Sequence, residues 1–248
     1  MLRARWERSC AKCDTPSAMQ KVADTGNFEL GLDEAGRGPM LGPLVLAAVA
    51  LSRTAQEELV SLGVQDSKRF GAGEKAHVRR KYLMTEIQKR ALFCEVTVVE
   101  AHEVDAAVFK GGLNELEREV AARLLLRSPQ VERICADGER LFGSLAKRFP
   151  LRNFVAQDKA DSLFPTVAAA SVCAKVVRDE RWFAFCERHR TAFPEELKGH
   201  CGGGYVNEAT RRFLRAYVQK HGRLPDETRL SWPRDFLADV LPQTELRF

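Results

Sequence analysis

The sequence lacks any apolar run of the roughly 20 residues that a membrane-spanning helix needs. It also lacks an apolar segment after the basic residues at its N-terminus, so nothing there is typical of a secretory signal. No internal repeat or low-complexity tract interrupts the chain. These absences favour a globular protein in the cytoplasm.

Cysteine is present but forms no recognisable framework. The seven cysteines are odd in number and spread through apolar segments, which is typical of reduced thiols. Cys10 and Cys13 form a lone C-x-x-C, with no second pair of Cys or His to complete a tetrahedral zinc site. Neither a disulfide scaffold nor structural zinc is therefore expected.

An excess of one charge is also nearly absent. Lys and Arg number 39 against 34 Asp and Glu, which gives a net charge of +5 and a pI near 8.9. This mild basicity suits a polyanionic partner without establishing one. The charge is less balanced in residues 208–223, where basic residues outnumber acidic ones. Apolar residues recur there at helical spacing, and the basic side of such a helix could follow a phosphate backbone or simply face solvent. The basic residues are Arg211, Arg212, Arg215, Lys220 and Arg223.

The most informative stretch, residues 30–39, reads LGLDEAGRGP. Apolar residues precede Asp33 and Glu34, and a turn rich in glycine and proline follows them. Two adjacent carboxylates repel each other unless a cation joins them, and oxygen ligands suit Mg²⁺ or Mn²⁺. The glycines let the backbone lie against a ligand, and Arg37 between them could grip phosphate. Taken alone, an exposed acidic pair in an ordinary hairpin is an equally good interpretation.

Other segments place further acids near this one. Residues 44–51 form an apolar run typical of a buried strand, and residues 91–100 predict another. The apolar stretch that begins at Val131 ends in Asp137. If this strand runs beside the strand that carries Asp33 and Glu34, Asp137 would lie at the same edge of the sheet. Asp161 comes just before a long helical pattern with Pro165 in its first turn.

Several ordered motifs, spread over most of the chain, resemble those of the ribonuclease HII family. The resemblance implies an α/β protein with a ribonuclease H-like fold, in which helices flank a central mixed sheet and a helical extension follows at the C-terminus. The matching residues are 31–39, 66–68, 113–115, 136–138, 159–161, 168–175, 178–179, 203–205 and 230–232.

The resemblance assigns the family's four catalytic, metal-binding carboxylates to Asp33, Glu34, Asp137 and Asp161. Four carboxylates can hold two divalent ions, Mg²⁺ or Mn²⁺, for an in-line displacement that needs no histidine or cysteine nucleophile. Asp179 is a rival for the fourth position. An acid beside an arginine in a helix is more often part of a surface ion pair, so Asp161 is preferred.

The resemblance also assigns the substrate-binding residues. In the family, backbone groups of the turn at Gly36, Arg37 and Gly38 read the ribose 2′-hydroxyl, the group that separates RNA from DNA. Tyr205 matches a tyrosine that packs on the following deoxyribose, although a lone tyrosine after glycines is more often buried. Residues 206–208 depart from the family pattern, which leaves substrate preference less secure than catalysis. Basic positions beside the substrate backbone fall on Lys68 and Lys159.

The implied organisation has four parts: a flexible N-terminal extension at 1–26, a catalytic core at 27–205, a helical substrate-binding extension at 206–240 and a tail at 241–248. The tail ends in Q-x-x-L-x-F, similar to the motif by which bacterial replication and repair proteins bind the sliding clamp. Gln243, Leu246 and Phe248 would be the clamp contacts, unless the motif arises by chance.

The resulting prediction is a metal-dependent endoribonuclease that acts on RNA–DNA hybrids and on duplex DNA containing ribonucleotides. It would cut the RNA strand of hybrids, or cut 5′ to a single embedded ribonucleotide, and leave 3′-hydroxyl and 5′-phosphate ends. Such an enzyme, expected to be a monomer, would serve in ribonucleotide removal and RNA primer removal. The alternative is a non-catalytic adaptor on the same fold that binds nucleic acid or the clamp, and loss of any of the four acids would favour it. None is lost.

Overall fold

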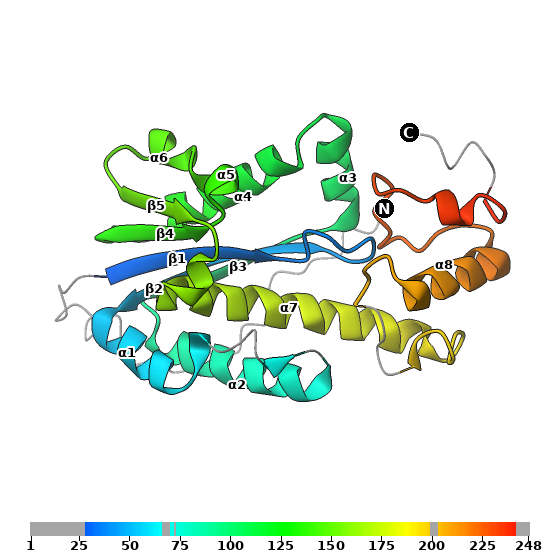
Figure 1. The fold of residues 1–248 in the computed structure, drawn as a ribbon, viewed down its shortest axis with the longest axis horizontal. Helices are drawn as coiled ribbons and strands as arrows, with labels where there is room; N and C mark the ends of the chain where they lie inside the picture. Colours follow the sequence, from blue (N-terminus) through cyan, green and yellow to red (C-terminus); the bar gives the residue numbers. More distant parts are fainter. Residues whose placement is uncertain (1–27, 66–69, 72, 199–202, 242–248) are drawn as a thin grey trace, which may run out of the picture.

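The computed structural model describes residues 28–65, 70–71, 73–198 and 203–241. A five-stranded sheet in the order β3-β2-β1-β4-β5 forms its centre (Figure 1). The strands are β1 (Phe28–Ala35), β2 (Leu44–Ser52), β3 (Phe93–Val99), β4 (Arg133–Asp137) and β5 (Asn153–Gln157). The helices are α1 (Arg53–Ser61), α2 (Glu74–Arg90), α3 (Ala101–Phe109), α4 (Leu113–Arg127), α5 (Glu139–Phe142), α6 (Leu145–Arg148), η3 (Ala160–Ser162), α7 (Pro165–Arg190), α8 (Glu208–His221) and η5 (Asp235–Leu237).

The sheet is mixed, as predicted. β1 pairs antiparallel with β2, and β2 antiparallel with β3, whereas β1, β4 and β5 run parallel. Parallel neighbours need crossover connections, and helices supply them here. The strands predicted at 44–51 and 91–100 are confirmed as β2 and β3, although β3 is shorter than predicted, and β4 does run alongside β1.

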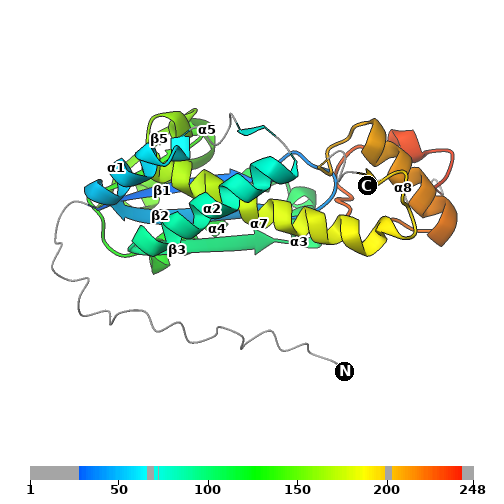
Figure 2. The same ribbon diagram turned by 90° about the horizontal axis from the view of Figure 1, so that it is seen from below.

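Helices cover both faces of the sheet. Figures 1 and 2 show α7, α1 and α2 on one face and α3 and α4 on the other. The side chains of β2 explain why its sequence is almost continuously apolar: Val45 and Ala47 pack toward α7, whereas Leu44 and Leu46 pack toward α4. A strand buried on both faces has no polar side to present to water.

Helix α7 lies unusually close to β1. A Cβ built on Gly31 would sit 2.0 Å from the carbonyl carbon of Thr166, so only glycine fits at this crossing. Small residues from Ala168 to Ala174 are buried along the same helix. Pro165 occupies the first turn, where its missing N–H costs no hydrogen bond. The position of α7 relative to β1 is thereby fixed at the level of the backbone.

The C-terminal part, residues 203–241, packs beyond the end of the sheet, against the distal half of α7 (Figure 1). Helix α8 begins at Asn207, whose side chain accepts from the N–H of Thr210, and buries Phe213 and Tyr217. Both rings pack with Phe193, at 5.3 and 5.5 Å between ring centroids. The expected helical extension is confirmed.

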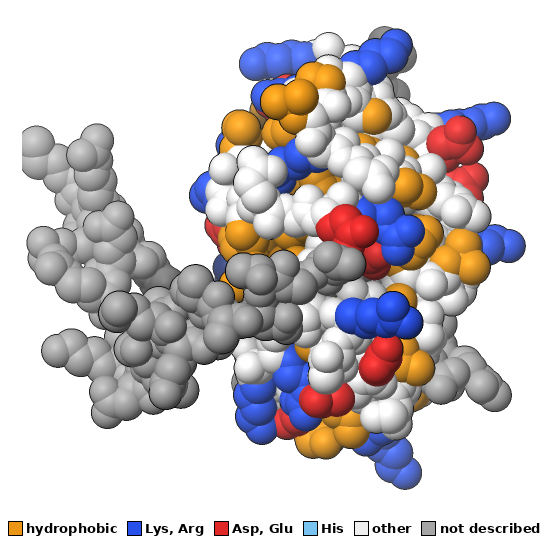
Figure 3. Space-filling view, turned by 90° about the vertical axis from the view of Figure 1, so that its left-hand side faces the viewer, with side chains coloured by type: hydrophobic (Ala, Val, Ile, Leu, Met, Phe, Trp, Pro, Cys, Tyr) orange, Lys and Arg blue, Asp and Glu red, His pale blue; other side chains and the backbone are white. Residues whose placement is uncertain are grey.

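Two further observations concern the helices and the cysteines of the described residues. Within these ranges, no helix is long and apolar enough to cross a membrane. Cys94, Cys135, Cys173 and Cys186 form no disulfide within the described ranges. The end of the molecule where β1 begins shows acidic and basic side chains interspersed rather than one basic patch (Figure 3).

Candidate active site

Three of the predicted carboxylates lie at one end of two neighbouring strands. Asp33 and Glu34 are in the last three residues of β1, and Asp137 is the last residue of β4. In the parallel register Leu32 is opposite Ala136, so the next residues along the two strands are Asp33 and Asp137. The pairing of β1 with β4 therefore brings together acids that are about 100 residues apart in sequence.

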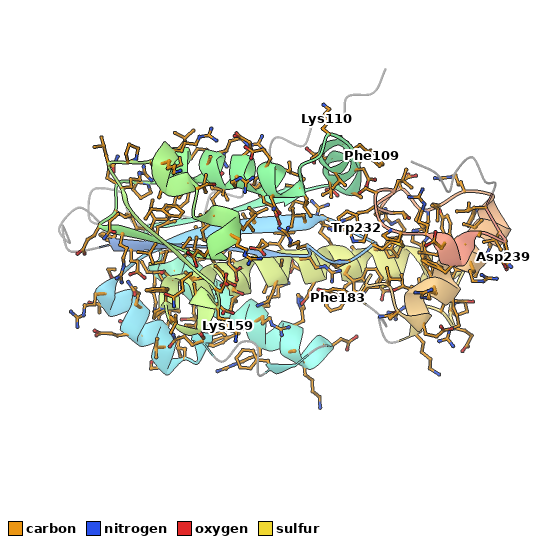
Figure 4. All side chains as sticks on the ribbon, turned by 45° about the horizontal axis from the view of Figure 1, so that its top comes forward. Phe109, Lys110, Lys159, Phe183, Trp232 and Asp239 are labelled. Carbon is orange, nitrogen blue, oxygen red and sulfur yellow. The ribbon has the colours of Figure 1, made fainter. Side chains whose placement is uncertain are left out.

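The fourth carboxylate comes from the turn that follows β5. Asp161 lies in η3 and is buried, with 5% of its surface exposed. The preceding N–H, that of Ala160, donates to Asp137 Oδ1 at 2.8 Å, which links η3 to the end of β4. Lys159 adopts φ 61°, a left-handed conformation that is uncommon for a residue with a side chain. Figure 4 labels Lys159 at this turn.

Burial and mutual repulsion make the acids of β1 hard to ionise. Burial raises the pKa of Asp33 to about 6, although a hydrogen bond from Ser171 and the charge of Lys175 oppose that rise. For Glu34, burial and then the charges of Asp33 and Glu117 raise the pKa to about 8. Carboxylates that resist ionisation in this way gain most from a cation.

The donor set fits a hard divalent metal ion. All four candidate ligands offer oxygen, and Glu34 Oε2 is buried without a hydrogen-bond partner among the described residues. In the ranges described, however, no three His, Cys, Asp or Glu side chains already converge as a metal cluster.

The glycine loop, residues Gly36–Pro39, continues directly from β1. Gly36 has φ +83°, and a Cβ there would sit 2.5 Å from the carbonyl oxygen of Pro43, so a side chain is excluded on both counts. A Cβ on Gly38 would lie 3.3 Å from Tyr205 Cε1, which places the tyrosine ring against the loop. Tyr205 is 52% exposed, so the alternative of a buried tyrosine is wrong here.

A family model described as Ribonuclease HII matches residues 30–235, most of the chain. The chain belongs to the ribonuclease HII family. The ribonuclease HII of Methanocaldococcus jannaschii is 30% identical over 239 residues, which cover 88% of this chain and 97% of the relative. That of Pyrococcus furiosus is 35% identical over 214 residues, covering 82% and 87%.

Solved structures agree with this assignment. Ribonuclease H2 from Pyrococcus horikoshii matches with a TM-score of 0.69 and 27% identity, over 86% of this chain and 96% of that one. Ribonuclease HII from Archaeoglobus fulgidus, solved in a complex with PCNA, matches with a TM-score of 0.66 and 35% identity, over 82% and 93%. The ribonuclease H-like fold is confirmed, and the protein is a metal-dependent hydrolase, a ribonuclease H.

The side chain of Arg37 contacts α4. Its guanidinium pairs with Glu117, which is fully buried, and donates to Asn114 Oδ1 at 2.5 Å. These two contacts tie the glycine loop to α4. A contact between Arg37 and phosphate stays a prediction.

Two functional candidates escaped the sequence reasoning, Glu117 and Arg229. A single charged residue is normally on the surface, so neither stands out in the sequence. Glu117 lies two residues beyond the matched motif at 113–115, and Arg229 directly precedes the motif at 230–232. Those neighbouring motifs were the available signal. Arg229 has no exposed surface and contacts the glycine loop.

The remaining candidates divide between those the structure describes and those it does not. Asp179 Oδ2 lies 3.7 Å from Arg80 Nη1, and Asp179 Oδ1 lies 3.8 Å from Arg178 Nη1. Asp179 therefore takes part in ion pairs, which is the interpretation that the sequence favoured for it. Lys68 and the tail residues Gln243, Leu246 and Phe248 lie outside the described residues.

Proposed function

We propose that this ribonuclease HII cuts the RNA strand of RNA–DNA hybrids and also cuts 5′ to a single ribonucleotide embedded in duplex DNA. The products would carry 3′-hydroxyl and 5′-phosphate ends, which suits ribonucleotide removal and RNA primer removal. One observation carries the proposal: the acids that end β1 and β4 adjoin a glycine loop with Tyr205 against it. Such a site can combine cleavage of a phosphodiester bond with recognition of the ribose beside it.

We infer that Asp33, Glu34, Asp137 and Asp161 hold two divalent ions, Mg²⁺ or Mn²⁺. Ions held there would lower the pKa of an attacking water and stabilise the leaving oxygen of an in-line displacement. The chain itself supplies the orientation. Ser171 and Lys175 fix Asp33 from α7, and the Ala160 N–H fixes Asp137. Ligands oriented in this way by neighbours bind metal more tightly.

The substrate-binding roles rest on the glycine loop and Tyr205. Backbone groups at Gly36, Arg37 and Gly38 would meet the 2′-hydroxyl, because the loop can approach a sugar closely without side chains at its glycines. The exposed Tyr205 ring would pack on the next deoxyribose. Lys159 and Lys68 would lie beside the phosphate backbone.

Cleavage of labelled duplexes tests the proposal. Three substrates are compared in Mg²⁺, Mn²⁺ or EDTA: DNA with one ribonucleotide, all-DNA duplex, and RNA–DNA hybrid. The expected result is a metal-dependent cut 5′ to the ribonucleotide and within the RNA strand of the hybrid, with all-DNA duplex left intact. Cleavage of all-DNA duplex, or no cut beside the ribonucleotide with either metal, would overturn the proposal.

We further propose that the tail binds a sliding clamp through Gln243, Leu246 and Phe248. The Archaeoglobus relative was solved in a complex with PCNA, which supports a clamp as the partner. Leucine and phenylalanine would fill an apolar pocket while glutamine enters a polar one. Removal of residues 243–248 should abolish clamp binding and leave cleavage of a short duplex unchanged, and clamp binding that survives the truncation would refute this role.

We also propose that the chain acts as a monomer in the cytoplasm. The described cysteines, Cys94, Cys135, Cys173 and Cys186, are not joined in disulfides, which fits a reducing compartment. Light scattering of the purified chain would show one protomer mass, and a dimer at working concentration would contradict the monomer.

A further inference from the structure

Arg229 has an unusual environment for an arginine. It has the largest side chain among the fully buried residues. Its guanidinium donates to three backbone carbonyls: Gly36 O at 2.6 Å, Arg37 O at 2.9 Å and Gly42 O at 3.1 Å. Two of these carbonyls belong to the glycine loop. A buried arginine is costly unless its donors are satisfied, and here the loop satisfies them.

Trp232 takes the next carbonyl of the loop. Its indole Nε1 donates to Gly38 O at 3.1 Å, and the Arg229 guanidinium lies 4.9 Å from the centroid of its ring. Figure 4 shows Trp232 at the junction between the sheet and the C-terminal part. The anchor segment, defined as residues Thr228–Trp232, thus binds three consecutive carbonyls of the glycine loop.

The anchor segment is itself fixed to the core by Asp105 on α3. One carboxylate oxygen of Asp105 accepts from the N–H of Leu230 at 2.7 Å, and the other accepts from the N–H of Ser231 at 2.8 Å. The Ser231 hydroxyl donates to the same carboxylate at 2.6 Å. Arg229 and Trp232 therefore contact the loop from a rigid support.

The geometry of the peptide bond gives these contacts a consequence. In a trans peptide the C=O of one residue and the N–H of the next point in opposite directions, and no described peptide is cis. With the carbonyls of Gly36 and Arg37 held by Arg229, the N–H groups of Arg37 and Gly38 point away from it. Within the described residues, neither of these N–H groups donates a hydrogen bond to a protein atom. Pro39 follows the third carbonyl and has no N–H to present.

We propose that Arg229 and Trp232 are positioning residues for ribose recognition, which aim the Arg37 and Gly38 N–H groups at the substrate by holding the loop carbonyls. The inference rests on the proposed function of the loop. It explains the orientation of the loop N–H groups by the contacts of Arg229 and Trp232 with the loop carbonyls. Lysine cannot replace Arg229 in this role, because a single ammonium group lacks the planar fork that reaches three carbonyls at once.

Kinetics on two duplexes test the proposal in the full-length chain. The variants are Arg229→Lys, which keeps the charge, and Trp232→Phe, which removes only the indole donor. Arg152→Lys is the matched control, because Arg152 also donates to a backbone carbonyl, Leu125 O at 3.0 Å, in the last turn of α4. Two quantities are measured: kcat/KM for duplex DNA with one ribonucleotide, and the inhibition constant of all-DNA duplex. Circular dichroism verifies folding.

Arg229→Lys should lower kcat/KM for the ribonucleotide duplex about tenfold, the equivalent of one hydrogen bond, and leave inhibition by all-DNA duplex unchanged. Trp232→Phe should act in the same direction and more weakly. A merely structural role would weaken both quantities together, and such a result in folded protein would overturn the inference. So would an unchanged kcat/KM in both variants. If Arg229→Lys fails to fold, Trp232→Phe decides the outcome alone. Failure of the wild-type enzyme to cut the ribonucleotide duplex would instead overturn the proposed function.

Discussion

The carboxylate end of the sheet, which carries Asp33, Glu34 and Asp137, is joined to the glycine loop by β1. The two regions are nevertheless held in place by different contacts. Asp33 and Asp137 are fixed by the pairing of β1 with β4. The loop is held by Arg229, which is 192 residues away from Arg37 in sequence. The acids depend on the core, whereas the loop depends on the C-terminal part. We therefore expect the proposed chemistry and the proposed ribose recognition to be separable by mutation.

The largest effect should follow a change at the carboxylate end. Asp137→Asn should lower turnover by about 10³-fold or more, because metal stabilisation supplies several kcal/mol and each 1.4 kcal/mol is tenfold. Binding of the ribonucleotide duplex should persist. Asp158→Asn is the control, since Asp158 is an exposed acid that accepts only from the Glu139 N–H. Near-normal turnover in Asp137→Asn, measured under single-turnover conditions, would remove it from the ligand set.

The stability of the metal-free protein should depend on pH through Glu34. Its pKa is raised from 4.5 to about 8 in the folded state, so the folded protein holds this proton more tightly than the unfolded chain does. The contribution of Glu34 to stability should therefore be fully present below pH 4.5 and be lost as the pH rises to about 8, by at most about 4 kcal/mol.

Urea unfolding in EDTA at a series of pH values measures this dependence. Glu34→Gln carries no titrating carboxyl, so it should show a flatter curve over the same range. Added Mg²⁺ should flatten the wild-type curve as well, because the cation favours the ionised form. Identical slopes for wild type and Glu34→Gln would contradict the electrostatic account of the carboxylate end.

The packing of α7 on β1 offers a third test, which concerns the core alone. Gly31→Ala should lower the free energy of unfolding by about 3 kcal/mol, because the added methyl meets the backbone of Thr166 and α7 must move. Gly222→Ala is the control, since no heavy atom lies within 4 Å of its Cβ and only the left-handed conformation is strained. Equal losses in the two variants would show that the close approach is not what limits substitution at Gly31.

The smallest effect should come from the cap of α8. Asn207→Ala removes the acceptor for the Thr210 N–H and should cost about 1 kcal/mol of stability, seen as a lower urea midpoint. Ribose discrimination should not change, because no hydrogen bond between described residues joins α8 to the glycine loop. A loss of discrimination would mean that the whole C-terminal part, and not only the anchor segment, orients the loop.

The sequence predicted the carboxylate end well and the support of the loop poorly. Asp33 and Asp137 each follow an apolar run, so the pattern itself places them at strand ends. Arg229 has no such local signal, because its partners are backbone carbonyls brought near only by the fold. The same holds for Glu117, a buried acid whose partner Arg37 comes from another element. Long-range polar contacts of this kind leave no periodicity to detect.

Binding in the Asp137→Asn background tests the central claim, that chemistry and ribose recognition have separate supports, most directly. Affinities for a ribonucleotide-containing duplex and an all-DNA duplex of the same sequence are measured in Mg²⁺, for Asp137→Asn and for Asp137→Asn with Arg229→Lys. We expect the single variant to prefer the ribonucleotide duplex and the double variant to lose that preference, with affinity for all-DNA duplex unchanged. An equal preference in both variants, or its loss in Asp137→Asn alone, would contradict the account.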